Sequence, residues 1–77
     1  MSKGHSSRRS QKDLKKIGLR VRELRLEKEL SQEALAELAD IHDRTVGEIE
    51  RGELNFSVRI LLQLCIALNV EPNDIVL

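Results

Sequence analysis

Apolar residues recur every three or four positions along most of the chain, and short polar segments interrupt them. Such spacing places apolar side chains on one face of an α-helix, so the pattern predicts helices and no strand. We expect these helices over residues 13–29, 32–39, 43–51, 58–68 and 72–75. The chain is therefore expected to fold as an all-α bundle of five short helices.

Capping residues mark the expected ends of these helices. Ser31 and Ser57 each stand just before an apolar periodic segment, where a hydroxyl accepts a hydrogen bond from a free backbone N–H. Gly52 and Asn69 follow such segments and tolerate the left-handed conformation that closes a helix. Pro72 suits the first position of the last turn.

The fourth helix carries apolar residues on two faces. Its inward face is expected to hold Val58, Leu61, Leu64, Cys65 and Leu68. Leu62 and Ile66 lie four residues apart on the opposite face, which the core of one monomer does not also bury. A two-fold homodimer explains them, with Ile75, Val76 and Leu77 joining the interface. Scattered exposed aliphatic side chains are the alternative.

The equal totals of 13 basic and 13 acidic residues conceal two unlike parts. Residues 1–16 hold six basic residues against Asp13 alone, a net charge of +5, and residues 17–77 hold seven basic against twelve acidic residues, a net charge of −5. We expect residues 1–12 to form a basic arm with the composition of a disordered segment, and residues 13–77 to form the folded domain. The arm is either a solvated tail or a segment that contacts phosphates.

Length and composition exclude several classes of protein. A chain of 77 residues buries roughly 60% of its unfolded surface, which leaves one modest core and no deep substrate pocket. Cys65 is the only cysteine, and two isolated histidines do not make a metal site. We therefore expect no enzyme, cofactor, metal or small-molecule effector. No segment has the composition of a signal peptide or a membrane span, which favours a cytoplasmic protein.

Two short helices joined by a tight turn, with Arg and Thr near the start of the second, follow the helix-turn-helix plan. The sequence also resembles the Cro and phage-repressor (XRE) type of DNA-binding domain over about residues 17–76. The motifs that carry this resemblance are VRELR at 21–25, LSQEALA at 30–36, IERG at 49–52 and ALNV at 67–70. The resemblance implies a five-helix, lambda-repressor-like domain that binds double-stranded DNA.

The resemblance also implies roles for individual residues. Gln32 matches the position at the start of the second helix where family members clamp a DNA phosphate. The exposed positions of the recognition helix, which lie in the major groove, are His42, Asp43, Arg44, Thr45 and Glu48. Of these, His42 is expected at a phosphate and as an imperfect helix cap. Arg51 and Asn55 match positions that meet the duplex backbone.

The Arg25–Glu50 pair is implied by the same resemblance to be a partly buried ion pair that ties the first helix to the third, a role in the scaffold of the domain.

Physical chemistry supports some of these base-reading roles more than others. The Arg44 guanidinium can grip O6 and N7 of guanine, worth about 1–3 kcal/mol of discrimination. Thr45 can contact a thymine methyl or a phosphate, or bond its own helix backbone. Asp43 and Glu48 can each accept from a cytosine amine. Alternatively, Asp43 is a helix N-terminal charge and Glu48 repels wrong sites.

The sequence departs from the family pattern at several places. The family commonly has glycine at the positions of Glu29 and Asp40, where the backbone turns sharply. Gly47 lies inside the recognition helix, where glycine costs about 0.5–1 kcal/mol relative to alanine. Either this glycine lets the helix backbone approach DNA closely, or it is a substitution that the helix tolerates and that has no functional role. Phe56 stands where many relatives have proline and is expected to fill the turn against the core.

These observations predict a homodimeric transcriptional regulator on a palindromic operator, with recognition helices about 34 Å apart. It would occupy a promoter or recruit RNA polymerase. A single aromatic residue leaves no stacking platform for single-stranded nucleic acid. Length and residues 55–57 resemble the restriction-modification controllers of the family, although their recognition-helix tyrosine is absent. The alternative function is an antitoxin or other protein-interaction module, with Leu62 and Ile66 covering the partner.

Overall fold

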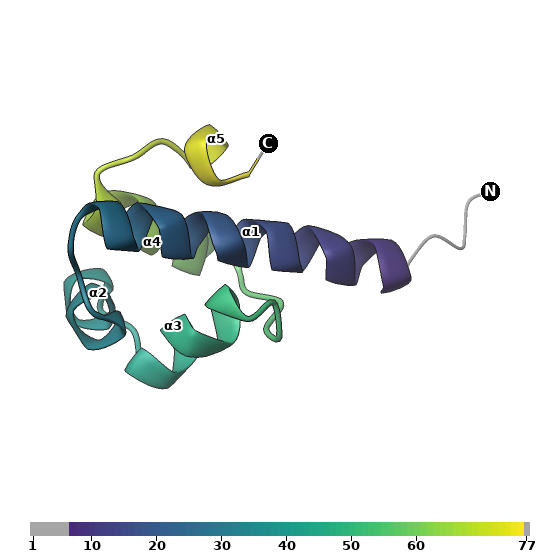
Figure 1. Ribbon diagram of the computed structural model, residues 1–77, viewed down its shortest axis with the longest axis horizontal. Helices are drawn as coiled ribbons and strands as arrows, with labels where there is room; N and C mark the ends of the chain where they lie inside the picture. Colours follow the sequence, from purple (N-terminus) through teal and green to yellow (C-terminus); the bar gives the residue numbers. More distant parts are fainter. Residues whose placement is uncertain (1–6, 77) are drawn as a thin grey trace.

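Five helices follow one another along the part of the chain that the computed structural model describes, residues 7–76, with side chains from residue 12 onward. They are α1 (Ser7–Glu27), α2 (Gln32–Ala39), α3 (Asp43–Glu50), α4 (Val58–Leu68) and α5 (Pro72–Ile75), and no strand occurs within these residues. Figure 1 shows α1 crossing the middle of the molecule, with α5 on one side of it and α2 and α3 on the other. The all-α, helix-turn-helix architecture expected from the sequence is confirmed.

The first helix begins earlier in the chain than its apolar spacing predicts. We expected residue 13, but α1 begins at Ser7, so residues 7–12 of the expected disordered arm are helical. This segment reads SRRSQK and contains no glycine or proline, and Arg, Gln and Lys all favour helices without needing an apolar face. Residues 1–6 and Leu77, one of the expected dimer residues, lie outside the described part of the chain.

The other helix ends follow from local capping chemistry. The Ser31 and Ser57 hydroxyls accept hydrogen bonds from the backbone N–H of Ala34 (2.9 Å) and Ile60 (3.2 Å), as expected. Asn69 closes α4 with φ of 58°, and Gly52 follows α3 with φ of 73°.

Glu29 and Asp40 also have positive φ, of 58° and 60°. The turns on either side of α2 therefore use the left-handed conformation even without glycine, which strains a residue that has a Cβ.

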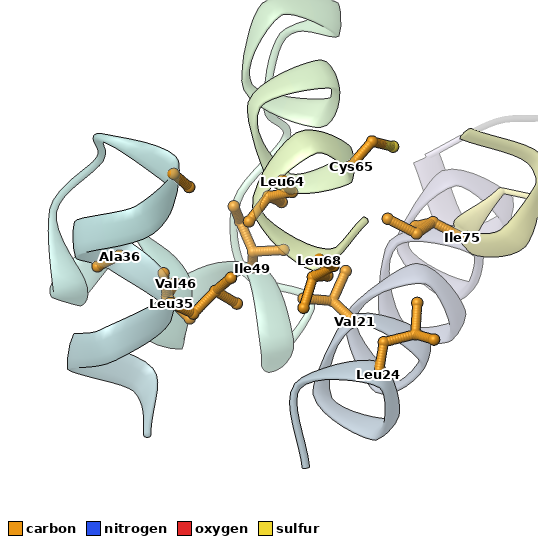
Figure 2. Packing of buried hydrophobic residues seen from close by; sticks show 11 residues of the cluster. Val21, Leu24, Leu35, Ala36, Val46, Ile49, Leu64, Cys65, Leu68 and Ile75 are labelled. Atoms are coloured by element: carbon orange, nitrogen blue, oxygen red, sulfur yellow. The ribbon is translucent and has the colours of Figure 1, made fainter. Parts of the chain in front are cut away.

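The core lies where α1, α2, α3 and α4 converge, and its side chains meet in Figure 2. It consists of Val21, Leu24, Leu35, Ala36, Ala39, Val46, Ile49, Leu64, Cys65, Leu68 and Ile75. The inward positions of Leu64 and Leu68 are confirmed. Val58, however, is 71% exposed, so its expected inward position is wrong. It is the first residue of α4 and lies in register with Leu62 and Ile66 on the outer face.

Helix α5 closes the bundle by placing Ile75 in the core, where its exposed fraction is only 3%. The expectation that Ile75 joins a dimer interface is therefore wrong, because α5 folds back against α1 and α4 and uses this side chain internally. Arg20 of α1 donates to the Asp74 carbonyl oxygen over 2.7 Å and holds the turn in place. Burial, followed by the negative charges of Glu71 and Asp74, raises the pKa of the Cys65 thiol.

Helices α1 and α3 approach each other through their main chains at Gly18. A Cβ placed on Gly18 would collide with the carbonyl oxygen of Ile49 and lie 2.7 Å from that of Glu50. Only glycine permits this approach without displacement of one helix. The contact therefore fixes the position of the carboxyl end of α3 on the body of the protein.

Candidate nucleic-acid interface

A buried ion pair links the first helix to the third, as expected from the sequence. The Arg25 Nε atom donates to Glu50 Oε2 over 2.7 Å, and Nη2 donates to Glu50 Oε1 over 3.1 Å. A third guanidinium nitrogen donates to the Leu30 carbonyl oxygen over 2.7 Å. Arg25 and Glu50 are 7% and 6% exposed. This two-point contact fixes α3 and the α1–α2 connection relative to α1.

The same carboxylate also orients Gln32, the first residue of α2. The Gln32 Nε2 atom donates to Glu50 Oε1 over 3.0 Å, and the Gln32 side chain is half-buried. An amide nitrogen has two N–H groups, so one stays available for a ligand outside. The sequence located Gln32 at the helix start but did not reveal this hydrogen bond.

A hollow of about 520 Å³ lies between the start of α2 and the outer face of α3. It is lined by Gln32, Glu33, Asp43, Arg44, Gly47 and Arg51. A Cβ on Gly47 would lie 3.1 Å from Arg51 Nη1 and 3.5 Å from Gln32 Oε1. Because glycine has no side chain, the floor of the hollow stays open at Gly47, between Gln32 and Arg51, which both carry hydrogen-bond donors.

Two arginines flank this floor, and each forms a loose ion pair. Arg44 is highly exposed, and its Nε lies 3.6 Å from Glu48 Oε2 one turn further along α3. The Nε of Arg51 lies 3.1 Å from Oε1 of Glu53. Exposed pairs of this kind contribute at most about 1 kcal/mol, so a base edge or phosphate can replace the carboxylate at little cost.

The structure separates the expected DNA-contacting residues into two groups. Gln32, Asp43, Arg44 and Arg51 line the hollow together, and the outward position of Asp43 in the first turn of α3 places its charge there as well. The remaining four lie elsewhere on or beside α3: His42, Thr45, Glu48 and Asn55.

Those four differ in exposure. His42 precedes α3 and makes no side-chain cap hydrogen bond, which confirms it as an imperfect cap. His42 and Asn55 are exposed, whereas Thr45 and Glu48 are half-buried. The lining role of Glu33 was not anticipated; its only signal in the sequence is its place in the first turn of α2.

A separate apolar surface runs along the outer face of α4. We call the α4 stripe the set Val58, Leu62 and Ile66, which follow one another at four-residue spacing and are 71%, 46% and 79% exposed. The exposure expected for Leu62 and Ile66 is thus observed. Their role in a dimer stays a prediction.

Within the described residues, no helix has the length and apolar composition that crossing a membrane requires.

Comparison with known proteins places this geometry among gene regulators. A family model described as helix-turn-helix matches residues 21–75. The control protein C.BamHI of Bacillus amyloliquefaciens is 40% identical over 60 residues, which cover 77% of this chain and 74% of that protein.

Two solved structures extend the likeness. The restriction-modification controller protein C.AhdI from Aeromonas hydrophila matches with a TM-score of 0.82 and 47% identity, over 83% of this chain and 97% of its own. The clp gene regulator ClgR from Corynebacterium glutamicum matches with a TM-score of 0.77 and 27% identity, over 80% of this chain and 66% of its own.

Proposed function

The chain belongs to the helix-turn-helix family of DNA-binding transcriptional regulators, and we propose that it acts as a homodimer on a palindromic operator with α3 in the major groove. Its family and relatives are regulators rather than enzymes. Two of those relatives are named control or controller proteins. We assign this chain the same role, namely control of transcription at a promoter that carries its operator.

The observation that carries this proposal is the anchored amide of Gln32 beside the glycine floor of the hollow. The Glu50 carboxylate holds one N–H of Gln32 inward, which leaves the other N–H and the first-turn backbone N–H groups of α2 for a phosphate oxygen. Arg51 lies on the other side of Gly47 and supplies positive charge. A phosphate bound here positions α3 on the duplex without reading sequence.

Arg44 is the proposed base reader. It is exposed on the outer face of α3 and held only by Glu48 over 3.6 Å. On leaving Glu48, its guanidinium can donate to O6 and N7 of a guanine, while the freed carboxylate can accept from a cytosine amine. Asp43 and Thr45 complete the base-contacting set, and His42 and Asn55 contact the backbone on either side.

The proposed dimer forms through the α4 stripe. A two-fold axis through this stripe would bury the same three exposed aliphatic side chains on both copies. Such a dimer presents two α3 helices to successive major grooves, about 34 Å apart, and reads a palindrome. Occupancy of the operator then blocks a promoter or recruits RNA polymerase.

Selection of bound duplexes from a random library tests the proposal. Wild-type protein is expected to enrich one palindromic sequence. Arg44→Lys keeps the charge but lacks the planar fork, so we expect lost preference at one guanine per half-site with much of the affinity retained. Gln32→Ala is expected to weaken binding to all duplexes about equally. If the wild-type protein enriches no sequence, the proposal of a specific operator is refuted. If Arg44→Lys prefers the same sequence as the wild-type protein, the assignment of Arg44 as the base-contacting residue is refuted.

A further inference from the structure

The amino-terminal half of α1 extends beyond the body of the protein. Lys15 packs over the turn after α3. The approach is close enough that a Cβ on Gly52 would lie 2.6 Å from Lys15 Cγ. Eight residues of α1 precede Lys15, which at the rise of an α-helix is about 12 Å. Figure 1 shows this end of α1 projecting past the other helices.

This projecting segment is strongly basic and almost free of apolar residues. Residues 7–16 hold five basic residues against Asp13, and Leu14 is their only apolar side chain. Lys12, Lys15 and Lys16 are exposed, and none of the ion pairs between described side chains involves them. A helix without an apolar face does not insert into a membrane surface, whereas its charge suits a polyanion.

The register of the helix separates these charges into two faces. Lys12 and Lys15 are three residues apart and lie on the same face of the helix, and we call this exposed pair the basic stripe. Lys15 approaches Gly52, the residue after Arg51, so the stripe lies next to the turn that follows α3. Lys16 lies about 100° further round the helix, at 3.6 residues per turn.

We propose that the basic stripe binds phosphates of double-stranded DNA beside the half-site that α3 contacts, an inference that rests on the proposed function. The helix-turn-helix family model matches residues 21–75 and therefore does not include this segment. Residues 17–77 carry a net charge of −5, which repels a duplex at long range. The stripe supplies sequence-independent attraction that offsets this repulsion.

The salt dependence of DNA binding tests this proposal, because each neutralised phosphate contributes about 0.9 to the slope of log K against log salt concentration. Lys12→Gln/Lys15→Gln is expected to reduce the slope by about 2 on a random-sequence duplex. Glutamine keeps the methylene carbons that pack on Gly52, and an unchanged thermal midpoint would show that the fold is intact. The single variant Lys15→Gln is expected to reduce the slope by about 1. Lys16→Gln is its matched control and is expected to leave the slope close to the wild-type value.

Phosphate ethylation interference on the selected operator locates the contact. We expect phosphates whose ethylation weakens the wild-type complex and leaves the double variant unaffected. The proposal is overturned if the double variant keeps the wild-type slope, or if Lys16→Gln lowers it as much as Lys15→Gln, since net charge alone would then explain the effect. If the wild-type protein selects no operator but the double variant still has a smaller slope on random-sequence duplex, the specific operator is refuted and phosphate binding by the basic stripe is supported.

Discussion

Removal of Arg25 tests how α3 is held against α1. Arg25→Met keeps most of the side-chain length but leaves Glu50, which is buried in the native protein, with one side-chain donor, Gln32. Loss of one partner from a buried pair costs about 3–5 kcal/mol. A domain of 77 residues has a free energy of unfolding of about 4–12 kcal/mol. The single substitution should therefore remove a quarter of the stability or more, and can unfold the protein.

The double variant Arg25→Met/Glu50→Leu reverses most of this loss. Replacing both members of a buried pair by apolar residues is often neutral or stabilising, because neither charge then has to be desolvated. We expect the double variant to be at least about 2 kcal/mol more stable than Arg25→Met, because the unpaired buried carboxylate is then gone. Its affinity for DNA should still fall, because Gln32 has lost the acceptor that orients its amide.

Urea unfolding followed by far-ultraviolet circular dichroism measures both effects. The chain has no tryptophan or tyrosine, so backbone ellipticity is the appropriate signal, and protein concentration must be held constant because association shifts apparent stability. The reasoning fails if Arg25→Met costs less than about 1 kcal/mol, or if the double variant loses the sum of the two single losses. Either result would mean that the pair is solvated rather than buried.

The structure carries three further predictions. Gly18→Ala should lower the free energy of unfolding by about 1–3 kcal/mol, because its methyl group meets backbone carbonyls that cannot rotate away; chemical denaturation that shows no loss would contradict the close approach. Glu29→Gly and Asp40→Gly should each raise the thermal midpoint by relieving positive φ, the former more, since Asp tolerates this conformation better than Glu. Ile66→Glu should sediment as a monomer at concentrations where Leu38→Glu still dimerises; Leu38 is an exposed aliphatic residue on another helix and serves as the control. If the wild-type protein is a monomer at every concentration, the dimer is refuted and another protein is favoured as the partner of α4.

Features governed by neighbours in sequence were predictable. The ends of α2 and α4 follow from Ser31, Ser57 and Asn69, whose side chains or conformations act within one turn. Val58 and Ile75 were misplaced because their burial depends on where α4 meets the core and on how α5 folds back. Periodicity assigns a residue to a face, but it does not say whether another helix covers that face.

The candidate site was predictable as a set of residues and not as a geometry. The resemblance located Gln32, Arg44 and Arg51, and the hollow brings these three together. The hydrogen bond from Gln32 to Glu50 joins residues 18 positions apart, and no local pattern encodes it. The extension of α1 to Ser7 was missed for a different reason, since residues 7–12 contain no apolar residue and apolar spacing cannot reveal such a helix.

The main-chain contact at Gly18 has a consequence for how this protein can change. Backbone atoms of α1 and α3 fix the angle between the two helices, so the outward side chains of α3 take no part in that joint. Exchange of Arg44 or Asp43 would then alter the preferred DNA sequence without repacking the core. With α3 in the proposed role, the preferred DNA sequence can therefore change one exposed residue at a time while the fold stays the same.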